Sequence, residues 1–308
     1  MLRMKGHTKR SILLLTLLIA FALRTVSLDW QSFWVDEVYS VYFVDRSLQE
    51  TVELIVNPRN NGPLYFLLLW FWDHAAGPSD FSLRYLSVLF SELTIAGMWA
   101  LAHRKFGARV AAVTTGLLAI SPFAVWYGQE ARMYALHMFL VVLSTLFLIR
   151  ALSESRVSRW FGYGVAINLL GYSHFFGAFT IAAQGIVTVV TTLTRPKKLR
   201  NYAITMLLIA WPYVAVIGYA LDLIPSFTLQ DNSKGFVPFH QMVKALISEY
   251  TLKASWVSVD RIWVLMVVAG GLVLLGLWEA WRRNWRYGVW VTGLLILPTL
   301  ILDRKSVV

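Results

Sequence analysis

Long apolar stretches, separated by short charged clusters, dominate this chain. A helix needs about 20 residues to cross roughly 30 Å of hydrocarbon. The pattern therefore predicts an all-α polytopic membrane protein with about nine transmembrane helices. The nine stretches that are long enough, or nearly so, are 11–28, 81–102, 108–126, 132–150, 160–173, 175–194, 202–221, 260–280 and 287–302.

A further apolar stretch, 63–76, has the length of an interfacial helix rather than of a span. If it does not cross, five inside segments hold 17 of the 28 lysines and arginines, as the positive-inside rule expects. If it crosses, four of those basic segments move outside. The sequence therefore predicts a helix on the outer surface. The inside segments are 1–10, 103–109, 150–159, 195–200 and 281–286.

The composition agrees with a membrane protein and excludes several other classes. The chain has 308 residues, 57% of them hydrophobic and only 15% charged, whereas soluble domains carry about 25% charge. Its net charge is +11, but the basic residues lie at the ends of apolar runs, so we expect no nucleic-acid partner. Cysteine is absent, which excludes disulfides and thiolate metal sites.

The chain is expected to form a single transmembrane domain over 1–308, with two long outer segments, 29–80 and 222–259. The basic N-terminus and the apolar run after it are read as an uncleaved first span rather than a signal peptide. This topology predicts a multi-pass protein of the plasma (inner) membrane. Its N-terminus is expected in the cytoplasm, and its first outer loop is expected to carry interfacial helices.

Two adjacent carboxylates, Asp36 and Glu37, follow the first span and are flanked by aromatic residues. One reading is a helix N-cap, for which aspartate is well suited. The other is a general base at the membrane surface, because partial desolvation tunes the pKa of a carboxylate for proton transfer. A cap alone needs neither the second acid nor the aromatic flank.

Other candidate residues come to the same side of the membrane in this topology. Glu130 and Arg132 lie between two spans, where they form either a functional pair or an ordinary interfacial ion pair. Arg84 begins a span, where it either neutralises a lipid phosphate or extends toward the interface. His174 lies at the break between two spans and is a weaker pocket candidate. Acids and arginines together suit a phosphate leaving group and a hydroxyl or amine acceptor.

Several common catalytic motifs do not occur. There is no glycine-rich phosphate loop, no His-Glu-x-x-His motif and no Gly-x-Ser-x-Gly motif. The sequence therefore gives no support to nucleotide binding or to zinc-dependent hydrolysis.

These residues, in this order, resemble the GT-C glycosyltransferases, in particular the bacterial relatives of protein O-mannosyltransferases and aminoarabinose transferases. The likeness extends over roughly 10–190. Its motifs are Trp34-Val35-Asp36-Glu37, Asn61-Gly62-Pro63-Leu64-Tyr65, Leu83-Arg84-Tyr85-Leu86-Ser87, Gln129-Glu130-Ala131-Arg132-Met133-Tyr134 and Tyr172-Ser173-His174.

The resemblance implies a GT-C fold whose first outer loop covers an active site on the periplasmic or extracellular side. It implies a polyprenyl-phosphate sugar as donor and a protein, glycan or lipid as acceptor. Asp36 matches the catalytic aspartate that deprotonates the acceptor, and Glu37 beside it is also expected in the catalytic group. Arg84 and Arg132 are expected to hold the donor phosphate, and the expected pocket residues are Glu130, Tyr134, Asn61 and His174. Some GT-C enzymes use a metal, but two arginines near the phosphate make one less necessary, so we expect no cofactor and no metal site.

Two other functions are compatible with the pattern. A transporter or flippase subunit for a lipid-linked substrate predicts paired broken helices and an internal repeat, and no repeat is found. Relatives usually continue through more spans, so the chain is also expected to lack the C-terminal part of the family. It could then be an inactive fragment.

Overall fold

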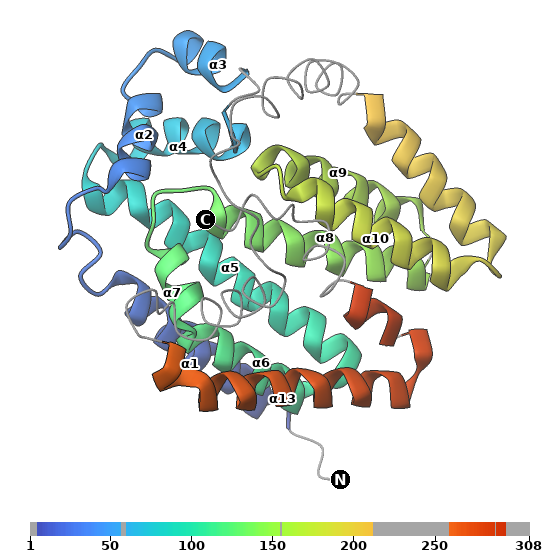
Figure 1. Ribbon diagram of the computed structural model, residues 1–308. Coiled ribbons are helices and arrows are strands. Elements are labelled where there is room, and N and C mark those ends of the chain that lie inside the picture. The colour runs from blue at the N-terminus through green and yellow to red at the C-terminus, as the bar shows by residue number, and fades with distance from the viewer. Residues whose placement is uncertain (1–4, 57–59, 155, 212–258, 287, 294–308) are drawn as a thin grey trace. The chain divides into compact units, whose positions relative to one another are not determined.

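A computed structural model describes residues 5–56, 60–154, 156–211, 259–286 and 288–293. Over these residues the secondary structure is helical and contains no strand, as Figure 1 shows. The chain divides into two compact units. The first contains 1–150 and 169–175, and the second contains 151–168 and 176–308.

The framework of the first unit is a group of apolar helices around α5 (Asp80–Phe106). This long helix packs against α1 (Gly6–Thr25), α6 (Ala108–Ile120) and α7 (Pro122–Gly128). Small side chains lie where the helices meet, and they allow the backbones to approach closely, as in other membrane bundles. In one cluster Ala20 and Ala119 pack with Ile95, and in another Ala102 and Ala111 pack with Trp99.

A sharp bend separates α6 from α7. The two helices are inclined by 61° at Ser121 and Pro122. Proline has no amide hydrogen, so the chain cannot continue the helical hydrogen-bond pattern through this point. The hydroxyl of Ser121 accepts a hydrogen bond from the Ala124 amide at 3.4 Å and begins the second helix.

Arg24 satisfies the carbonyl groups that this bend leaves free. It is 0% exposed, and its guanidinium donates to the carbonyls of Ala119 (3.0 Å) and Leu118 (3.4 Å). Its Nε donates to Ser91 Oγ on α5 at 2.7 Å. Backbone groups cannot be left without partners in hydrocarbon, so one side chain from α1 holds the bend and ties three helices together.

Three short helices form the segment that the sequence predicts as the first outer loop, which is called the outer loop below: α2 (Val35–Val44), α3 (Leu48–Val56) and α4 (Pro63–Ala76). They pack on one another, and α4 also packs against α5. In Figure 1 they gather at the end where α5 begins. Phe43 of α2 stacks on Phe66 of α4, with ring centroids 4.3 Å apart. The bounds predicted for the 63–76 helix agree with those of α4.

The chain continues through α8 (Tyr134–Glu154), α9 (Val157–Ser173) and α10 (Gly177–Thr192). Residues 196–211 are helical. After the undescribed segment come α13 (Val259–Arg283) and further helical residues at 285–286 and 288–293. In the second unit the polar side chains of Tyr163 and Gln184 pair inside the apolar surroundings, with an oxygen–oxygen distance of 3.1 Å.

The predicted all-α membrane fold is confirmed. Within the described residues, α1, α5 and α8 are long and apolar enough to cross a membrane, and the bent α6–α7 pair could be a fourth span. The expected spans at 202–221 and 287–302 extend beyond the described residues, and the expected outer segment 222–259 lies almost wholly outside them. The count of nine spans and the single-domain organisation stay predictions.

Replacing Arg24 by methionine should destabilise the protein because it leaves buried carbonyl groups without donors. The expected loss is about 2 kcal/mol in the free energy of unfolding. Thermal unfolding of the purified protein in detergent measures it. Arg10→Met is the matched control, because Arg10 lies exposed on the same helix. Equal stability of the two variants would contradict the role given to Arg24.

Candidate active site

A buried ion pair joins the first outer loop to α5. Glu37 is 1% exposed and Arg84 is 5% exposed. The two side chains form a bidentate pair: Arg84 Nε donates to Glu37 Oε1 at 2.9 Å, and Nη2 donates to Oε2 at 2.7 Å. The planar guanidinium matches the carboxylate in this geometry, which a lysine could not reproduce.

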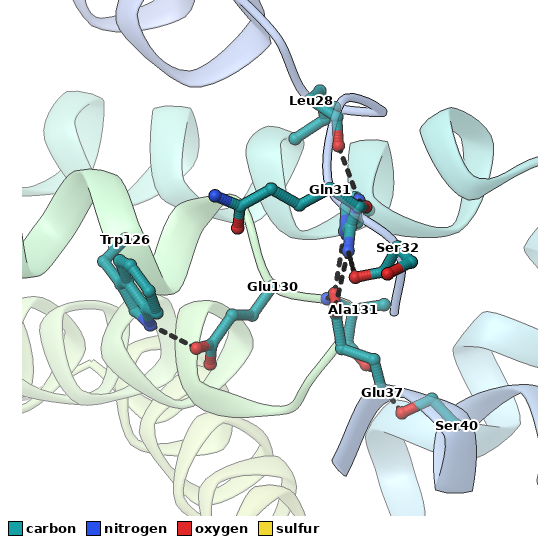
Figure 2. Close-up of polar contacts among 9 residues, drawn as sticks. Leu28, Gln31, Ser32, Glu37, Ser40, Trp126, Glu130 and Ala131 are labelled. Atoms are coloured by element: carbon teal, nitrogen blue, oxygen red, sulfur yellow. Dashed lines mark hydrogen bonds and ion pairs between the residues drawn. The ribbon is translucent and has the colours of Figure 1, made fainter. Parts of the chain in front are cut away.

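The guanidinium of Arg84 also organises the segment that precedes α2. Its Nη1 donates to the carbonyls of Leu28 (2.8 Å) and Gln31 (2.7 Å), and its Nη2 donates to that of Ser32 (3.4 Å). Figure 2 shows these carbonyl-bearing residues and Glu37 converging on one point. All five N–H groups of Arg84 therefore have partners within the protein, although the sequence led us to expect it at the donor phosphate.

The same carboxylate fixes the turn between α7 and α8. Glu37 Oε1 accepts a hydrogen bond from the Ala131 amide at 2.9 Å, and the Ser40 hydroxyl donates to the Ala131 carbonyl at 2.6 Å. Figure 2 shows both side chains of α2 beside this residue. Glu37 and Ser40 are three positions apart and so lie on one face of the helix. Both backbone groups of Ala131, in the turn, are thus hydrogen-bonded to side chains of α2.

Asp36 and Arg132 meet beside this turn. Arg132 Nη1 donates to the backbone carbonyl of Asp36 at 3.0 Å, and the Arg132 guanidinium lies 5.6 Å from the centroid of the Phe66 ring. Both side chains are partly buried. The Nε atom of Arg132 is buried and has no hydrogen-bond partner among the described residues. A buried donor of this kind calls for a ligand or another polar group.

Residues of α4 and α5 hold the backbone of Arg132 through a chain of hydrogen bonds. The Ser87 hydroxyl donates to the Arg132 carbonyl at 3.3 Å, and the Tyr65 hydroxyl lies 3.0 Å from Ser87 Oγ. Burial raises the pKa of the Tyr65 phenol well above its usual value, although Ser87 and the charge of Arg132 act against this. Tyr65 therefore stays neutral and serves as a hydrogen-bonding support.

Asn61, Tyr134 and His174 come together in the first unit. Asn61 Oδ1 accepts a hydrogen bond from the Phe175 amide at 2.9 Å, and the rings of Tyr134 and His174 are 5.9 Å apart. Burial lowers the pKa of the His174 imidazole to about 3, with smaller contributions from His137 and Arg132. His174 is therefore neutral at physiological pH, which suits contact with a ligand better than proton transfer.

Glycine at position 62 permits this convergence. Its φ is +84°, and a Cβ built there would lie 3.0 Å from Met133 Cγ and 3.2 Å from the Ser173 carbonyl. Only glycine allows the loop before α4 to approach both segments so closely. The close approach brings Asn61 to the break between α9 and α10.

Glu130 lies on the turn with Ala131 and Arg132. It is 6% exposed and accepts a hydrogen bond from the Trp126 indole N–H, which Figure 2 shows. It lines a cavity of about 290 Å³ together with Glu37 and Arg84, whereas Asp36 and Arg132 are not among the lining residues.

The structure thus places all eight expected site residues in one unit, around the outer loop and the 129–134 turn. Sequence reasoning gave no role to Ser40, Tyr65 or Ser87. The spacing of Glu37 and Ser40 was a usable signal, and Tyr65 and Ser87 lie in motifs that carry the resemblance. No group of three histidine, aspartate or glutamate side chains that could hold a metal ion occurs in the described part of the chain.

Replacing Arg84 by lysine should loosen the outer loop. Lysine keeps the charge but cannot pair with Glu37 through two parallel bonds and also bind three carbonyls. We expect a loss of about 3 kcal/mol in unfolding free energy, the size seen when a buried ion pair is broken. Thermal unfolding checks this against Arg104→Lys, an exposed position on the same helix. A lysine variant as stable as that control would refute the assigned role.

Comparison with known proteins identifies the family of this chain. Residues 60–219, more than half of the chain, match the model of the dolichyl-phosphate-mannose-protein mannosyltransferase family. The matched range contains Arg84, Arg132 and His174, and it begins after Asp36. Comparisons with curated proteins and with solved structures gave no match. The chain therefore belongs to the dolichyl-phosphate-mannose-protein mannosyltransferase family, and it is a membrane glycosyltransferase of the GT-C type.

Proposed function

We propose that the protein transfers a sugar from a polyprenyl-phosphate donor to a hydroxyl or amine of an acceptor. The observation that carries this proposal is the contact between Asp36 and Arg132, in which Arg132 also keeps a buried Nε without a partner among the described residues. This contact, made through the backbone carbonyl of Asp36, holds an acidic residue and a cation with an available donor in one site. Such a site suits a reaction in which a base removes the acceptor proton and a cation stabilises the charge that develops on the phosphate.

In this proposal Asp36 is the general base. Its carboxylate takes the proton of the acceptor hydroxyl or amine as the acceptor oxygen or nitrogen bonds to the anomeric carbon of the sugar. The bond from that carbon to the phosphate oxygen breaks in line, and polyprenyl phosphate leaves. Asp36 is partly buried at the first turn of α2, so its carboxylate is neither fully hydrated nor sealed from substrate. Its assignment rests on this position, since the family match begins at residue 60.

We assign the donor phosphate to Arg132. The negative charge of the phosphate increases as polyprenyl phosphate leaves, and a preorganised guanidinium stabilises this charge. Phe66 and the Asp36 carbonyl hold the Arg132 side chain in place before the substrate arrives. Arg84 would have to give up bonds to Glu37 or to backbone carbonyls before it could join the phosphate.

Glu37 and Arg84 act as positioning residues in this scheme. Their pair holds the start of α2, and Glu37 holds the Ala131 amide, so they fix the two segments that carry Asp36 and Arg132. Tyr134, Asn61, His174 and Glu130 are assigned to the walls of the substrate site.

The side of the membrane follows from the charge distribution. If the basic segments identified above face the cytoplasm, the loop 29–80 and the 129–134 turn face the outside. We therefore propose a multi-pass protein of the plasma (inner) membrane whose reaction takes place on the periplasmic or extracellular face. The acceptor is a protein, a glycan or a lipid that reaches that face.

Replacing Asp36 by asparagine should remove the base while preserving the shape of the side chain. We expect transfer to fall at least about 100-fold, the lower range for loss of a general base. The assay follows label from polyprenyl-phosphate sugars in membranes that contain the protein. Asp45→Asn, at the exposed end of the same helix, is the matched control and should retain activity.

The Asp36→Asn assay also distinguishes sugar transfer from the other functions that the sequence permits. Transport of a lipid-linked substrate would survive the Asp36→Asn change. A wild-type protein that is folded and inserted but transfers no label would overturn the proposal for this chain.

Replacing Arg132 by glutamine should mainly affect the donor. We expect a decrease of roughly 100-fold in kcat/KM for the donor, as when one preorganised stabilising group is removed. The kinetic assay varies the concentration of the polyprenyl-phosphate sugar. Arg46→Gln, elsewhere in the outer loop, should change this value little. A normal kcat/KM in the Arg132 variant would exclude Arg132 from phosphate binding.

A further inference from the structure

A cavity of about 290 Å³ is lined by Glu37, Arg84 and Glu130, and the scheme above assigns no particular ligand to it. Its volume is at the lower end of the range for small-molecule sites, about 300–1,000 Å³. It therefore has room for a single ring-sized group and not for a polyprenyl tail. Six of the residues that line it decide its chemistry: Trp30, Trp34, Trp126, Gln31, Gln129 and Glu130.

Three indole rings from two segments provide the apolar surface. Trp30 and Trp34 come from the loop before α2, and Trp126 comes from α7. They are 84%, 47% and 43% exposed, so a ligand that enters the cavity can reach the ring faces. Exposed aromatic rings grouped in a concave site favour a ligand with a flat apolar face.

Amide and carboxylate groups provide the polar surface. The amides of Gln31 and Gln129 can both donate and accept hydrogen bonds, and the carboxylate of Glu130 accepts them. Gln129 is fixed through its Nε2, which lies 3.3 Å from the Leu23 carbonyl, and Glu130 is fixed by the Trp126 indole. A ligand that carries several hydroxyl groups matches this mixture of donors and acceptors.

The charged groups of the cavity disfavour a phosphate. Among the described residues that line it, Arg84 is the single cation, and all of its N–H groups already have partners. Arg132, to which we assigned the phosphate, is not among the lining residues. The residues that line the cavity therefore differ from the residue assigned to the donor phosphate.

We propose that this cavity binds one sugar ring of a saccharide-bearing acceptor. A pyranose ring has an apolar C–H face that can lie on the tryptophan rings and a rim of hydroxyls that can bond to the amides and to Glu130. Glu37 lines the cavity, and Asp36 is the residue directly before it in the chain. This inference rests on the proposed function, since it names the acceptor as saccharide. The rigid network of Arg84 beneath the cavity reduces the ordering cost of binding.

The test measures binding of simple sugars to the full chain in lipid nanodiscs. The probes are the methyl glycosides of glucose, mannose, galactose and N-acetylglucosamine, detected by saturation-transfer NMR. At least one should bind saturably, and Trp34→Ala should weaken that binding about tenfold or more. Trp34→Phe, which keeps an aromatic face, should restore part of it. Trp211→Ala, which removes an exposed indole outside the cavity, should have no effect.

Thermal unfolding of each variant verifies that it is folded. The inference is overturned if no glycoside binds, or if binding is the same in Trp34→Ala and in the wild type. Competition by inorganic phosphate at similar concentrations would also overturn it, because the cavity would then be an anion site.

The two proposals fail in different ways. Asp36→Asn should abolish transfer and leave glycoside binding intact. If the proposed function is wrong, the wild type transfers no sugar but still binds the glycoside. If only this inference is wrong, transfer proceeds and no glycoside binding depends on the tryptophans.

Discussion

The buried pair of Glu37 and Arg84 is the constraint on which the site depends. Charges removed from water are costly unless their partners are complete, and here both side chains are fully engaged. The pair connects α2, the loop before it and α5, and through the Ala131 amide it also reaches the turn before α8. Four segments far apart in sequence therefore share one electrostatic centre close to the expected outer boundary of the membrane.

Two tasks are divided between neighbouring residues around this pair. On α2, the backbone carbonyl of Asp36 contacts Arg132, whereas Glu37 lines the cavity together with its partner Arg84 from α5. The 130–132 turn has the same division, since Glu130 lines the cavity and Arg132 contacts Asp36. Adjacent residues thus serve the proposed proton transfer and the proposed sugar binding, and both depend on one rigid support.

Sequence reasoning was most successful where the signal was local or statistical. Hydropathy predicted the helical membrane fold, and the length of 63–76 gave the bounds of α4. The convergence of Asn61, Tyr134 and His174 was expected from the resemblance and not from the residues alone. The partners of Arg84 could not be predicted, because pairing with Glu37 depends on side-chain geometry across 47 positions. Arg24 was missed for the same reason, since an arginine at the end of a span usually suggests an interfacial residue.

The position of Arg24 has a consequence for biogenesis. The residue that satisfies the bend at Pro122 precedes the carbonyls it binds by about 95 positions. During synthesis α1 leaves the ribosome first, and α5, which supplies Ser91, follows it. The guanidinium is therefore already present when the interrupted helix is made. The order of the chain thus allows Arg24 to bind the carbonyls at the bend as soon as α6 and α7 pack against α1.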